Sequence, residues 1–267
     1  MKFMNRVLVS LILVPVMLLM FYQGGVYMFA FLGVLVLMML HELRNNYSKK
    51  GFNIPVTMLI FGLLVYISIQ LPMQYLILIV FAGLIITSGN YLFKNQADKA
   101  IKKLAVTWFS IFYTAIPLSL LMSIRNISTE QSDGRVIAIS LLVVIWITDT
   151  MAYLSGKLLG RHKGVIKISP NKSVEGYIGG LLFAVIASIG MVLYFDKLDP
   201  KFIWMLALAG GLFGQFGDLF ESMIKRDLEV KDSSSILQEH GGILDRFDSL
   251  LFAAPALYIL LKFMGYF

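Results

Sequence analysis

The sequence predicts an all-α, polytopic integral membrane protein, and three observations support this fold class. Hydrophobic residues make up 58% of the 267-residue chain, whereas soluble domains contain about 45–50%. Charged residues make up only 15%, against about 25% in soluble domains. The mean hydropathy is +0.79, and the apolar residues fall in long runs rather than in the short periodic stretches of a soluble chain.

Nine of these runs are candidate transmembrane helices, because a helix needs roughly 17–25 mainly apolar residues to cross the hydrocarbon core. They lie at residues 7–22, 26–41, 56–71, 75–93, 104–123, 136–154, 176–195, 203–220 and 249–266. The first run follows Lys2 and Arg6, as the core of a signal peptide would. No small-residue cleavage site comes after it, so we interpret it as a helix.

The distribution of basic residues predicts the topology. With the N-terminus in the cytoplasm, 18 of the 23 Lys and Arg residues fall on the cytoplasmic side. Cytoplasmic connections carry such an excess in membrane proteins. We therefore expect the C-terminus on the opposite side, and we attribute the net charge of +7 to topology rather than to nucleic-acid binding.

The polar connections are unevenly distributed along the chain. We expect one integral membrane domain over 1–267, with a helical scaffold at 1–135 and a catalytic region at 136–267. Two long cytoplasmic connections, at 155–175 and 221–248, contain most of the polar residues of the second region. The chain has no cysteine, which excludes disulfides, thiolate catalysis and cysteine-based zinc sites.

The stretch ITDTMAYLSGKLLGRHKG, residues 147–164, places Asp149 about one turn before the cytoplasmic end of a span. Tyr153, Gly156 and Gly160 follow at spacings that put them on the same helix face. An intramembrane Asp is unfavourable by about 2.5–3.5 kcal/mol on insertion scales and usually lines a polar cavity. The alternative is an interfacial Asp149 paired with Lys157.

The stretch KISPNKSVEGYIGG, residues 167–180, contains Ser169-Pro170, which has the pattern of a helix N-cap followed by proline. Lys172 stands where a capping glutamate is usual, so the cation opposes the helix dipole. A bound phosphate would remove this conflict. The alternative is that Lys172 points into water.

Two further stretches bring acids next to basic residues. In GQFGDLFESMIKRDLEVKD, Asp218 ends a span, and Ser222, Lys225 and Arg226 follow at helical spacing. In HGGILDRFDS, Asp245 and Asp248 share one face at the start of the last span. A solvated helix end and a favourable helix dipole are the alternatives for these acids. Because Mg²⁺ takes one or two carboxylates plus substrate phosphates, we expect Asp218 and Asp245 to converge on one ion.

These residues resemble the signature of the phosphatidate cytidylyltransferase, or CDP-diacylglycerol synthase, family. The matching positions are Ser222, Lys225-Arg226, Lys231-Asp232, His240-Gly241-Gly242, Asp245-Arg246 and Asp248. ISPNKSVEGYIGG and the segment around Asp149 are similar to two more conserved stretches of that family. The chain departs from the family pattern at Gln238-Glu239, where Pro-Gly is usual, and at Ser173, where Thr is common.

The resemblance implies transfer of CMP from CTP to phosphatidic acid in the cytoplasmic (inner) membrane, with the active site facing the cytoplasm. It implies Mg²⁺ on Asp218 and Asp245, leaves room for a second, monovalent cation, and is compatible with a homodimer. Phosphate-binding or orienting roles are implied for Lys172, Lys225, Arg226, Asp248 and His240. Substrate-binding roles are implied for Asp149, Ser169, Asn171, Ser173, Ser222, Lys231, Gly241, Gly242 and Arg246.

Two other functions remain open. A CTP-dependent lipid kinase would use a similar nucleotide pocket but would transfer the γ-phosphoryl group. An ion-coupled membrane transporter would also have intramembrane acids, although transporters often carry polar, broken helices in both halves.

Overall fold

The computed structural model describes residues 14–93, 97–129, 132–195, 198–230, 234 and 241–267. Apart from one small hairpin, the described regular structure is helical, as predicted. The first described helical residues are Val14–Gln23. The long helices are α2 (Gly25–Lys49), α3 (Thr57–Ser68), α4 (Met73–Phe93), α5 (Ala100–Arg125), α6 (Gly134–Leu159), α7 (Val174–Tyr194), α9 (Gly214–Asp227) and α10 (Leu244–Phe263). The hairpin pairs β1 (Ser128–Thr129) with β2 (Ser132–Asp133), between α5 and α6.

Six of the described helical segments are long and apolar enough to cross a membrane. They are Gly25–Lys49, Met73–Phe93, Ala100–Arg125, Gly134–Leu159, Val174–Tyr194 and Phe202–Asp227. The apolar helix Thr57–Ser68 is shorter, and so is the described part of the first helix, Val14–Gln23; residues 7–13 of the first predicted span lie outside the described residues. The predicted count of nine spans therefore stays a prediction, whereas the class of a polytopic helical membrane protein is confirmed.

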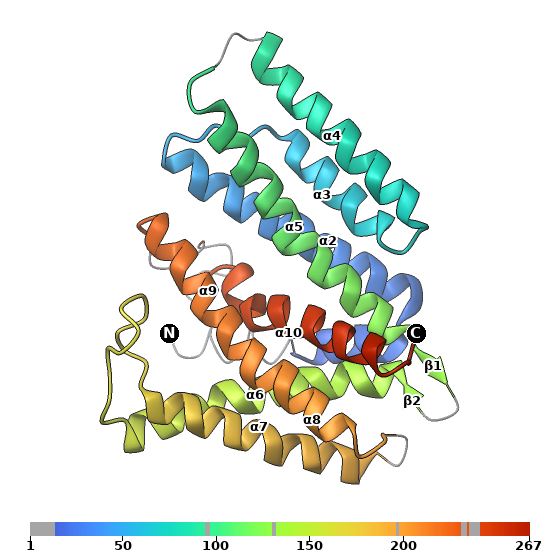
Figure 1. The fold of residues 1–267 in the computed structure, drawn as a ribbon, viewed down its shortest axis with the longest axis vertical. Helices are drawn as coiled ribbons and strands as arrows, with labels where there is room; N and C mark the ends of the chain where they lie inside the picture. The colour runs from blue at the N-terminus through green and yellow to red at the C-terminus, as the bar shows by residue number, and fades with distance from the viewer. Residues whose placement is uncertain (1–13, 94–96, 130–131, 196–197, 231–233, 235–240) are drawn as a thin grey trace.

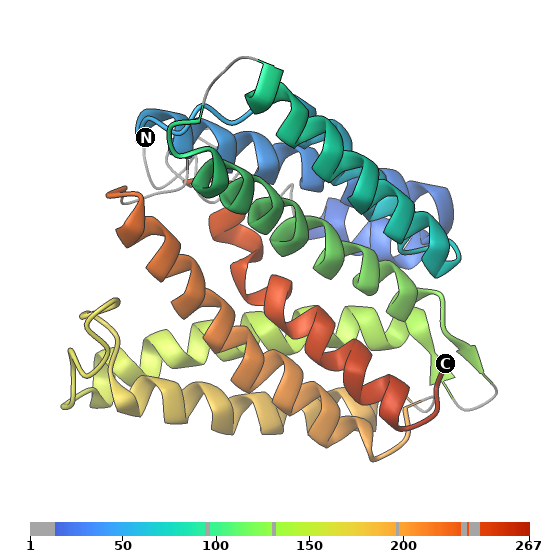
Figure 2. The same ribbon diagram turned by 45° about the horizontal axis from the view of Figure 1, so that its top comes forward.

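The helices form two groups with α10 between them. Helices α2, α3, α4 and α5 pack together, and α6 and α7 pack with the segment from α8 (Phe202–Leu206) to α9. Helix α10 contacts α5 on one side and α9 on the other, as Figures 1 and 2 show. Since α10 carries Asp245 and Asp248 in its first turns, this position places both acids between the two groups of helices.

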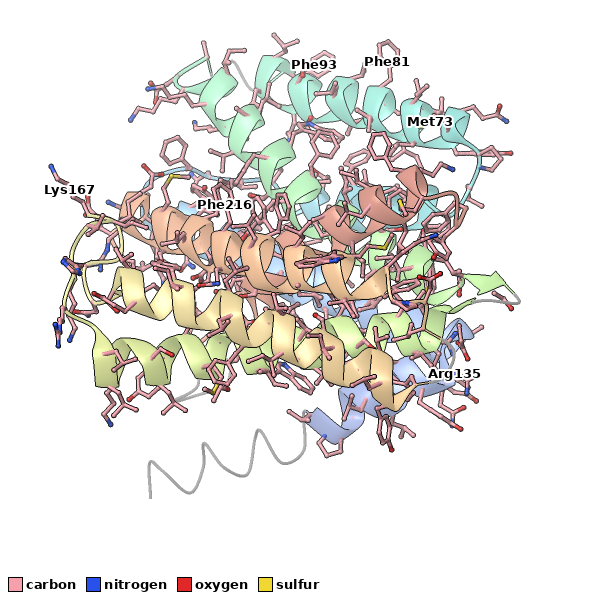
Figure 3. The ribbon with its side chains drawn as sticks, turned by 60° about the horizontal axis from the view of Figure 1, so that its bottom comes forward. Met73, Phe81, Phe93, Arg135, Lys167 and Phe216 are labelled. Carbon is pink, nitrogen blue, oxygen red and sulfur yellow. The ribbon has the colours of Figure 1, made fainter. Side chains whose placement is uncertain are left out.

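The outer surface is apolar where a bilayer would surround it. Met73, Phe81 and Phe93 on α4 all have exposed side chains and lie along one edge in Figure 3. The same view labels Lys167, on the loop between α6 and α7, and Arg135, near the start of α6, at opposite ends of the molecule. The loop that contains Lys167 and the α6 N-terminus thus mark the two ends of the bundle.

The largest errors in the predicted helix ends have the same cause. Helix α2 continues to Lys49, α6 continues to Leu159, α9 continues to Asp227, and α10 begins at Leu244. The α6–α7 connection is therefore only residues 160–173, and both ends of the predicted 221–248 connection are helical. Hydropathy marks only the apolar part of a helix, whereas polar residues extend the same helix beyond the hydrocarbon core.

A π-helical segment, η1 (Ala207–Phe213), joins α8 to α9. Its two glycines allow close packing on α6 and α7: a Cβ on Gly210 would lie 2.8 Å from Val144 Cγ1, and one on Gly211 would lie 2.6 Å from Ala184 Cβ. π-helical turns are rare in proteins, and those that occur often lie at functional sites. This one immediately precedes the helix that carries Asp218.

Candidate active site

A polar cavity of about 350 Å³ lies at the end of the bundle that carries the α6–α7 loop. Helices α6, α7 and α9 form its walls together with that loop. Its charged and amide-bearing lining side chains include Asp149, Lys157, Lys163, Asn171, Lys172 and Asp218. A cavity in which both lysines and aspartates are gathered among apolar helices is suited to phosphate groups and hard cations.

Asp149 lines this cavity together with Tyr153 and Gly156, as the helical spacing predicts. The prediction that Asp149 lies one turn from the helix end was wrong, because α6 continues to Leu159, about three turns beyond it. Gly160, the fourth residue predicted on that face, follows the last residue of α6. A Cβ on Gly160 would lie 2.7 Å from Ser173 Oγ, so this glycine allows the loop to return close to α6.

Lys172 forms an ion pair with Asp218 across the cavity, through Nζ and Oδ2. The predicted N-cap at Ser169 was wrong: α7 begins at Val174, and Ser173 Oγ accepts a hydrogen bond of 3.1 Å from the Gly176 N–H. Ser169 instead lies in a turn, where its carbonyl accepts from the Lys172 N–H. Lys172 therefore precedes the helix, and its cation is compensated by an acid on α9 rather than left against the helix dipole.

Two contacts fix the shape of the α6–α7 loop. Glu175, in the first turn of α7, lies 2.6 Å from His162 Nδ1 and accepts a bond of 3.2 Å from the His162 backbone N–H. On the opposite side, Arg226 Nε donates to the Ile168 carbonyl over 3.3 Å. The loop that carries Asn171 and Lys172 is thus anchored to both α7 and α9.

A second ionic cluster joins α9 to α10. Lys225 Nζ lies 2.5 Å from Glu221 Oε2 and 2.8 Å from Asp245 Oδ1. Asp245 Oδ2 also accepts a bond of 2.7 Å from the Gly242 N–H. Gly241 has a φ of 76°, a conformation that glycine adopts without strain, and it turns the chain into α10.

Sequence reasoning missed Glu221, although it stands four residues before Lys225. Its side chain is completely buried. A buried carboxylate is unfavourable unless it is paired, and Lys225 supplies the pairing charge. The sequence signal was an acid one turn beyond Asp218 and four residues before Lys225 on the same helix.

Asp248 connects the two clusters. It has electrostatic interactions with Asp149 and Asp218 and with Lys225. Gly217 allows a close approach: a Cβ there would lie 2.4 Å from the Asp248 carbonyl oxygen, so the backbones of α9 and α10 are in contact. Together the clusters contain more carboxylates than lysines. The carboxylates are Asp149, Asp218, Glu221, Asp245 and Asp248, and the lysines, including those that line the cavity, are Lys157, Lys163, Lys172 and Lys225.

This donor set fits Mg²⁺. Among the described residues, no three His, Asp or Glu side chains form a ready-made metal site. Mg²⁺ does not need one, since it is commonly held by one or two carboxylates, waters and the phosphates of the substrate. The excess of carboxylate oxygen over lysine supplies suitable ligands. The convergence of Asp218 and Asp245 on one ion stays a prediction, as each acid binds a lysine here.

The other predicted site residues are distributed around this centre. Ser222 is half-buried on α9, Asn171 lines the cavity, and Arg246 is exposed on α10. Ser173 is 3% exposed and caps α7, so its hydroxyl serves the fold. Lys231 and His240, and the Gln238-Glu239 departure, lie outside the described residues.

Sequence reasoning also missed a buried acid in the N-terminal region. Glu42, on α2, is 1% exposed. Its Oε1 accepts from the Ile243 N–H over 2.8 Å and its Oε2 from the Leu244 N–H over 2.9 Å. A carboxylate at the start of α10 accepts hydrogen bonds from two N–H groups that have no partner within the helix. Its negative charge also interacts favourably with the positive end of the helix dipole. The sequence signal was Glu42 itself, an acid directly after residue 41, where the span was predicted to end.

Comparison with known proteins agrees with this geometry. A family model described as "Cytidylyltransferase family" matches residues 4–264. A protein of Staphylococcus haemolyticus (strain JCSC1435) named phosphatidate cytidylyltransferase is 37% identical over 267 residues, covering 97% of each chain. Proteins of the same name from Staphylococcus aureus (strain COL) and Staphylococcus epidermidis (strain ATCC 35984) are 37% and 35% identical. These alignments cover 96% and 97% of this chain, and 98% and 97% of those relatives. From the polar cavity, the paired ionic clusters and a match along almost the whole sequence, we conclude that the chain belongs to the cytidylyltransferase family.

Proposed function

We propose that this protein transfers the CMP group of CTP to phosphatidic acid, which gives CDP-diacylglycerol and pyrophosphate. The observation that carries the proposal is the cavity of lysines and carboxylates enclosed by membrane-type helices. The charged side chains of such a site can bind the phosphates of a soluble nucleotide, and a lipid can reach the same site from the membrane. The relatives' shared name, phosphatidate cytidylyltransferase, agrees with this reaction.

The reaction exchanges one phosphorus–oxygen bond for another. An oxygen of the phosphatidate phosphate attacks the α-phosphorus of CTP, and the bond from that phosphorus to the bridging β-oxygen breaks, so that pyrophosphate leaves. The attacking oxygen is already anionic, and therefore no general base is needed. Catalysis then consists of positioning the two phosphates and compensating their charge.

The residues of the chain supply this positioning. Lys172, Lys225 and Arg226 bind phosphate oxygens, and Asp149 and Asp248 orient the lysines and the nucleotide. Asp218 and Asp245 would hold Mg²⁺, which when bound neutralises the α-phosphate and the leaving pyrophosphate. The Lys172–Asp218 ion pair would open as substrate and metal enter, since each partner then binds a group of opposite charge.

A labelling experiment separates the proposed reaction from its alternatives. With purified protein, phosphatidate and Mg²⁺, label from α-³²P CTP is expected in the lipid product. A lipid kinase would incorporate label only from γ-³²P CTP. A transporter would incorporate neither label, and would show solute flux in proteoliposomes without CTP turnover. No CDP-lipid with any divalent metal would refute the proposal.

The proposal includes an orientation. The end of the bundle that carries the α6–α7 loop faces the cytoplasm, where CTP is, and the protein lies in the cytoplasmic membrane. The excess of Lys and Arg in the connections at that end supports this orientation. A homodimer is compatible with the proposal, and no step of it involves nucleic acid.

A matched pair of loop substitutions tests the role of Lys172. We expect Lys172→Gln to raise the KM for a phosphate-bearing substrate about tenfold or more, because a charge-assisted bond to phosphate contributes about 1.5–3 kcal/mol. Lys167→Gln removes the same charge from an exposed position of the same loop and is expected to change KM less than about twofold. Steady-state kinetics with each substrate varied in turn measures both. Equal effects of the two substitutions would mean that only the net charge of the loop matters.

A further inference from the structure

A second cavity, of about 290 Å³, lies between α7 and the segment formed by η1 and α9. Most of its lining is aliphatic or aromatic: Ile178, Leu181, Leu212, Phe216 and Leu219. Ile178, Leu181, Leu212 and Phe216 are exposed on the outer surface of the helices, and Figure 3 labels Phe216 on α9. This apolar groove therefore opens toward the acyl region of a surrounding bilayer.

Two residues belong to both cavities. Tyr177 and Gln215 line the polar cavity and also the apolar groove, so the two spaces share a wall. Gln215 Nε2 donates to the Tyr177 carbonyl over 3.3 Å and to the Gly211 carbonyl over 2.9 Å, which fixes the glutamine across the gap between α7 and η1. The boundary between the polar cavity and the apolar groove is thus fixed by hydrogen bonds between the helices.

Unsatisfied polar atoms lie at this junction. Tyr177 Oη and Gln215 Oε1 are both buried and, within the part of the chain that the structure describes, have no hydrogen-bond partner. Gln215 is only 8% exposed. Buried polar atoms are paired in the great majority of cases, because an unpaired one loses its hydration without compensation. A ligand with polar atoms at this point would supply the missing partners.

The order of groups along the wall corresponds to the order of groups in a diacylglycerol phosphate. Lys172 Nζ, a phosphate-binding candidate, lies 5.9 Å from the centre of the Tyr177 ring. Tyr177 follows in the first turn of α7, and Ile178 and Leu181 then lead away from the polar end along α7. Leu219, Phe216 and Leu212 lead in the same direction along α9 and η1, because these segments run antiparallel to α7 in Figure 1.

We infer that the groove between α7 and η1–α9 binds one acyl chain of the phosphatidate substrate, with its ester group at Tyr177 and Gln215. The Tyr177 hydroxyl donates to an ester carbonyl, and Gln215 Oε1 accepts from a water that bridges to the same ester. This inference rests on the proposed function. An acyl chain leaves one apolar environment for another here, so the groove contributes alignment of the phosphate rather than hydrophobic affinity.

Adjacent leucines on α7 provide a matched test. Leu181 lines the groove, whereas Leu182 does not line it and is exposed on the same helix. Leu181→Trp fills the groove, and we expect it to lower kcat/KM for dioleoyl phosphatidate about tenfold through overpacking. For dibutanoyl phosphatidate, whose four-carbon chains end before Leu181, one helical turn from Tyr177, we expect less than about a threefold loss, and an unchanged KM for CTP. Leu182→Trp is expected to leave all three values within about twofold.

Tyr177→Phe tests the ester contact separately. It removes one hydroxyl and is expected to raise the KM for both phosphatidates by about five- to tenfold, with the KM for CTP unchanged. Purified full-length protein in mixed micelles is used throughout, and thermal unfolding confirms that each variant is folded.

Three results would overturn the inference. Equal kinetics of Leu181→Trp and Leu182→Trp would mean that the groove holds only an annular lipid. An equal loss with both chain lengths in Leu181→Trp would mean that this substitution disturbs the polar cavity itself. An unchanged phosphatidate KM in Tyr177→Phe would remove the ester contact. If instead the unsubstituted protein makes no CDP-lipid, the proposed function fails before the groove is tested.

Discussion

Asp218→Asn is expected to lower kcat by about 10²–10³-fold, because it removes a charge that both the Lys172 pair and a bound Mg²⁺ require. Asparagine has nearly the same shape, so the packing of α9 against α10 at Gly217 should be retained. The measurement is CDP-lipid formation from labelled CTP over a range of Mg²⁺ concentrations. If Asp218 holds the metal, the Mg²⁺ concentration for half-maximal rate should rise in parallel.

Asp227→Asn is the matched control for this substitution. It removes the same charge from the last, exposed position of the same helix and is expected to change kcat less than about twofold. Near-normal activity of Asp218→Asn would exclude Asp218 as a metal ligand. A reduced rate with an unchanged Mg²⁺ dependence would instead assign Asp218 to positioning Lys172.

Much of the candidate site could be predicted from the sequence because helical spacing is a local property. Asp149, Tyr153 and Gly156 were expected on one face, and all three line the polar cavity. The same reasoning placed Asp245 and Asp248 at the start of the last helix, where the structure has them in α10. An acid within an apolar span indicates a functional site, since only a polar cavity or a charged partner compensates the cost of burying it.

The pairing of the acids with the lysines could not be predicted, because it depends on packing between distant helices. The Lys172–Asp218 pair joins the loop to α9, and Lys225 joins α9 to Asp245 on α10. The close contact at Gly217 that brings Asp248 next to Asp218 has no signature in the spacing of the acids. Helix ends were also predicted too short, since polar residues beyond the hydrocarbon core give no hydropathy signal.

The contribution of the N-terminal region to the site could not be predicted either, because it also depends on packing between distant helices. Glu42 lies 201 positions before Ile243 in the sequence, yet it supplies the acceptors for the first turn of α10. An isolated Glu near the end of a span suggests an interfacial residue in water. Only the fold shows that this carboxylate is buried against the helix that carries Asp245 and Asp248.

Glu42→Ala is therefore expected both to destabilise the protein and to inactivate it. The substitution leaves two buried N–H groups, of Ile243 and Leu244, without their acceptor, and each such loss destabilises by about 1–3 kcal/mol. We expect a total of about 2–6 kcal/mol, visible as a lower Tm in detergent. Because Asp245 closely follows Ile243 and Leu244, a displaced helix start should also lower kcat by about tenfold or more, even well below the Tm.

Two companion substitutions separate positioning from stability. Glu42→Gln keeps one carbonyl oxygen as an acceptor and should recover part of both the Tm and the rate. Glu229→Ala removes an acid that is 79% exposed and paired with Lys50, and it should change stability by less than about 0.5 kcal/mol. If Glu42→Ala lowers the Tm but the folded fraction keeps the full kcat, Glu42 only stabilises the fold. If the rate falls at temperatures where the variant is fully folded, the buried carboxylate of α2 positions the acids of α10 for the reaction.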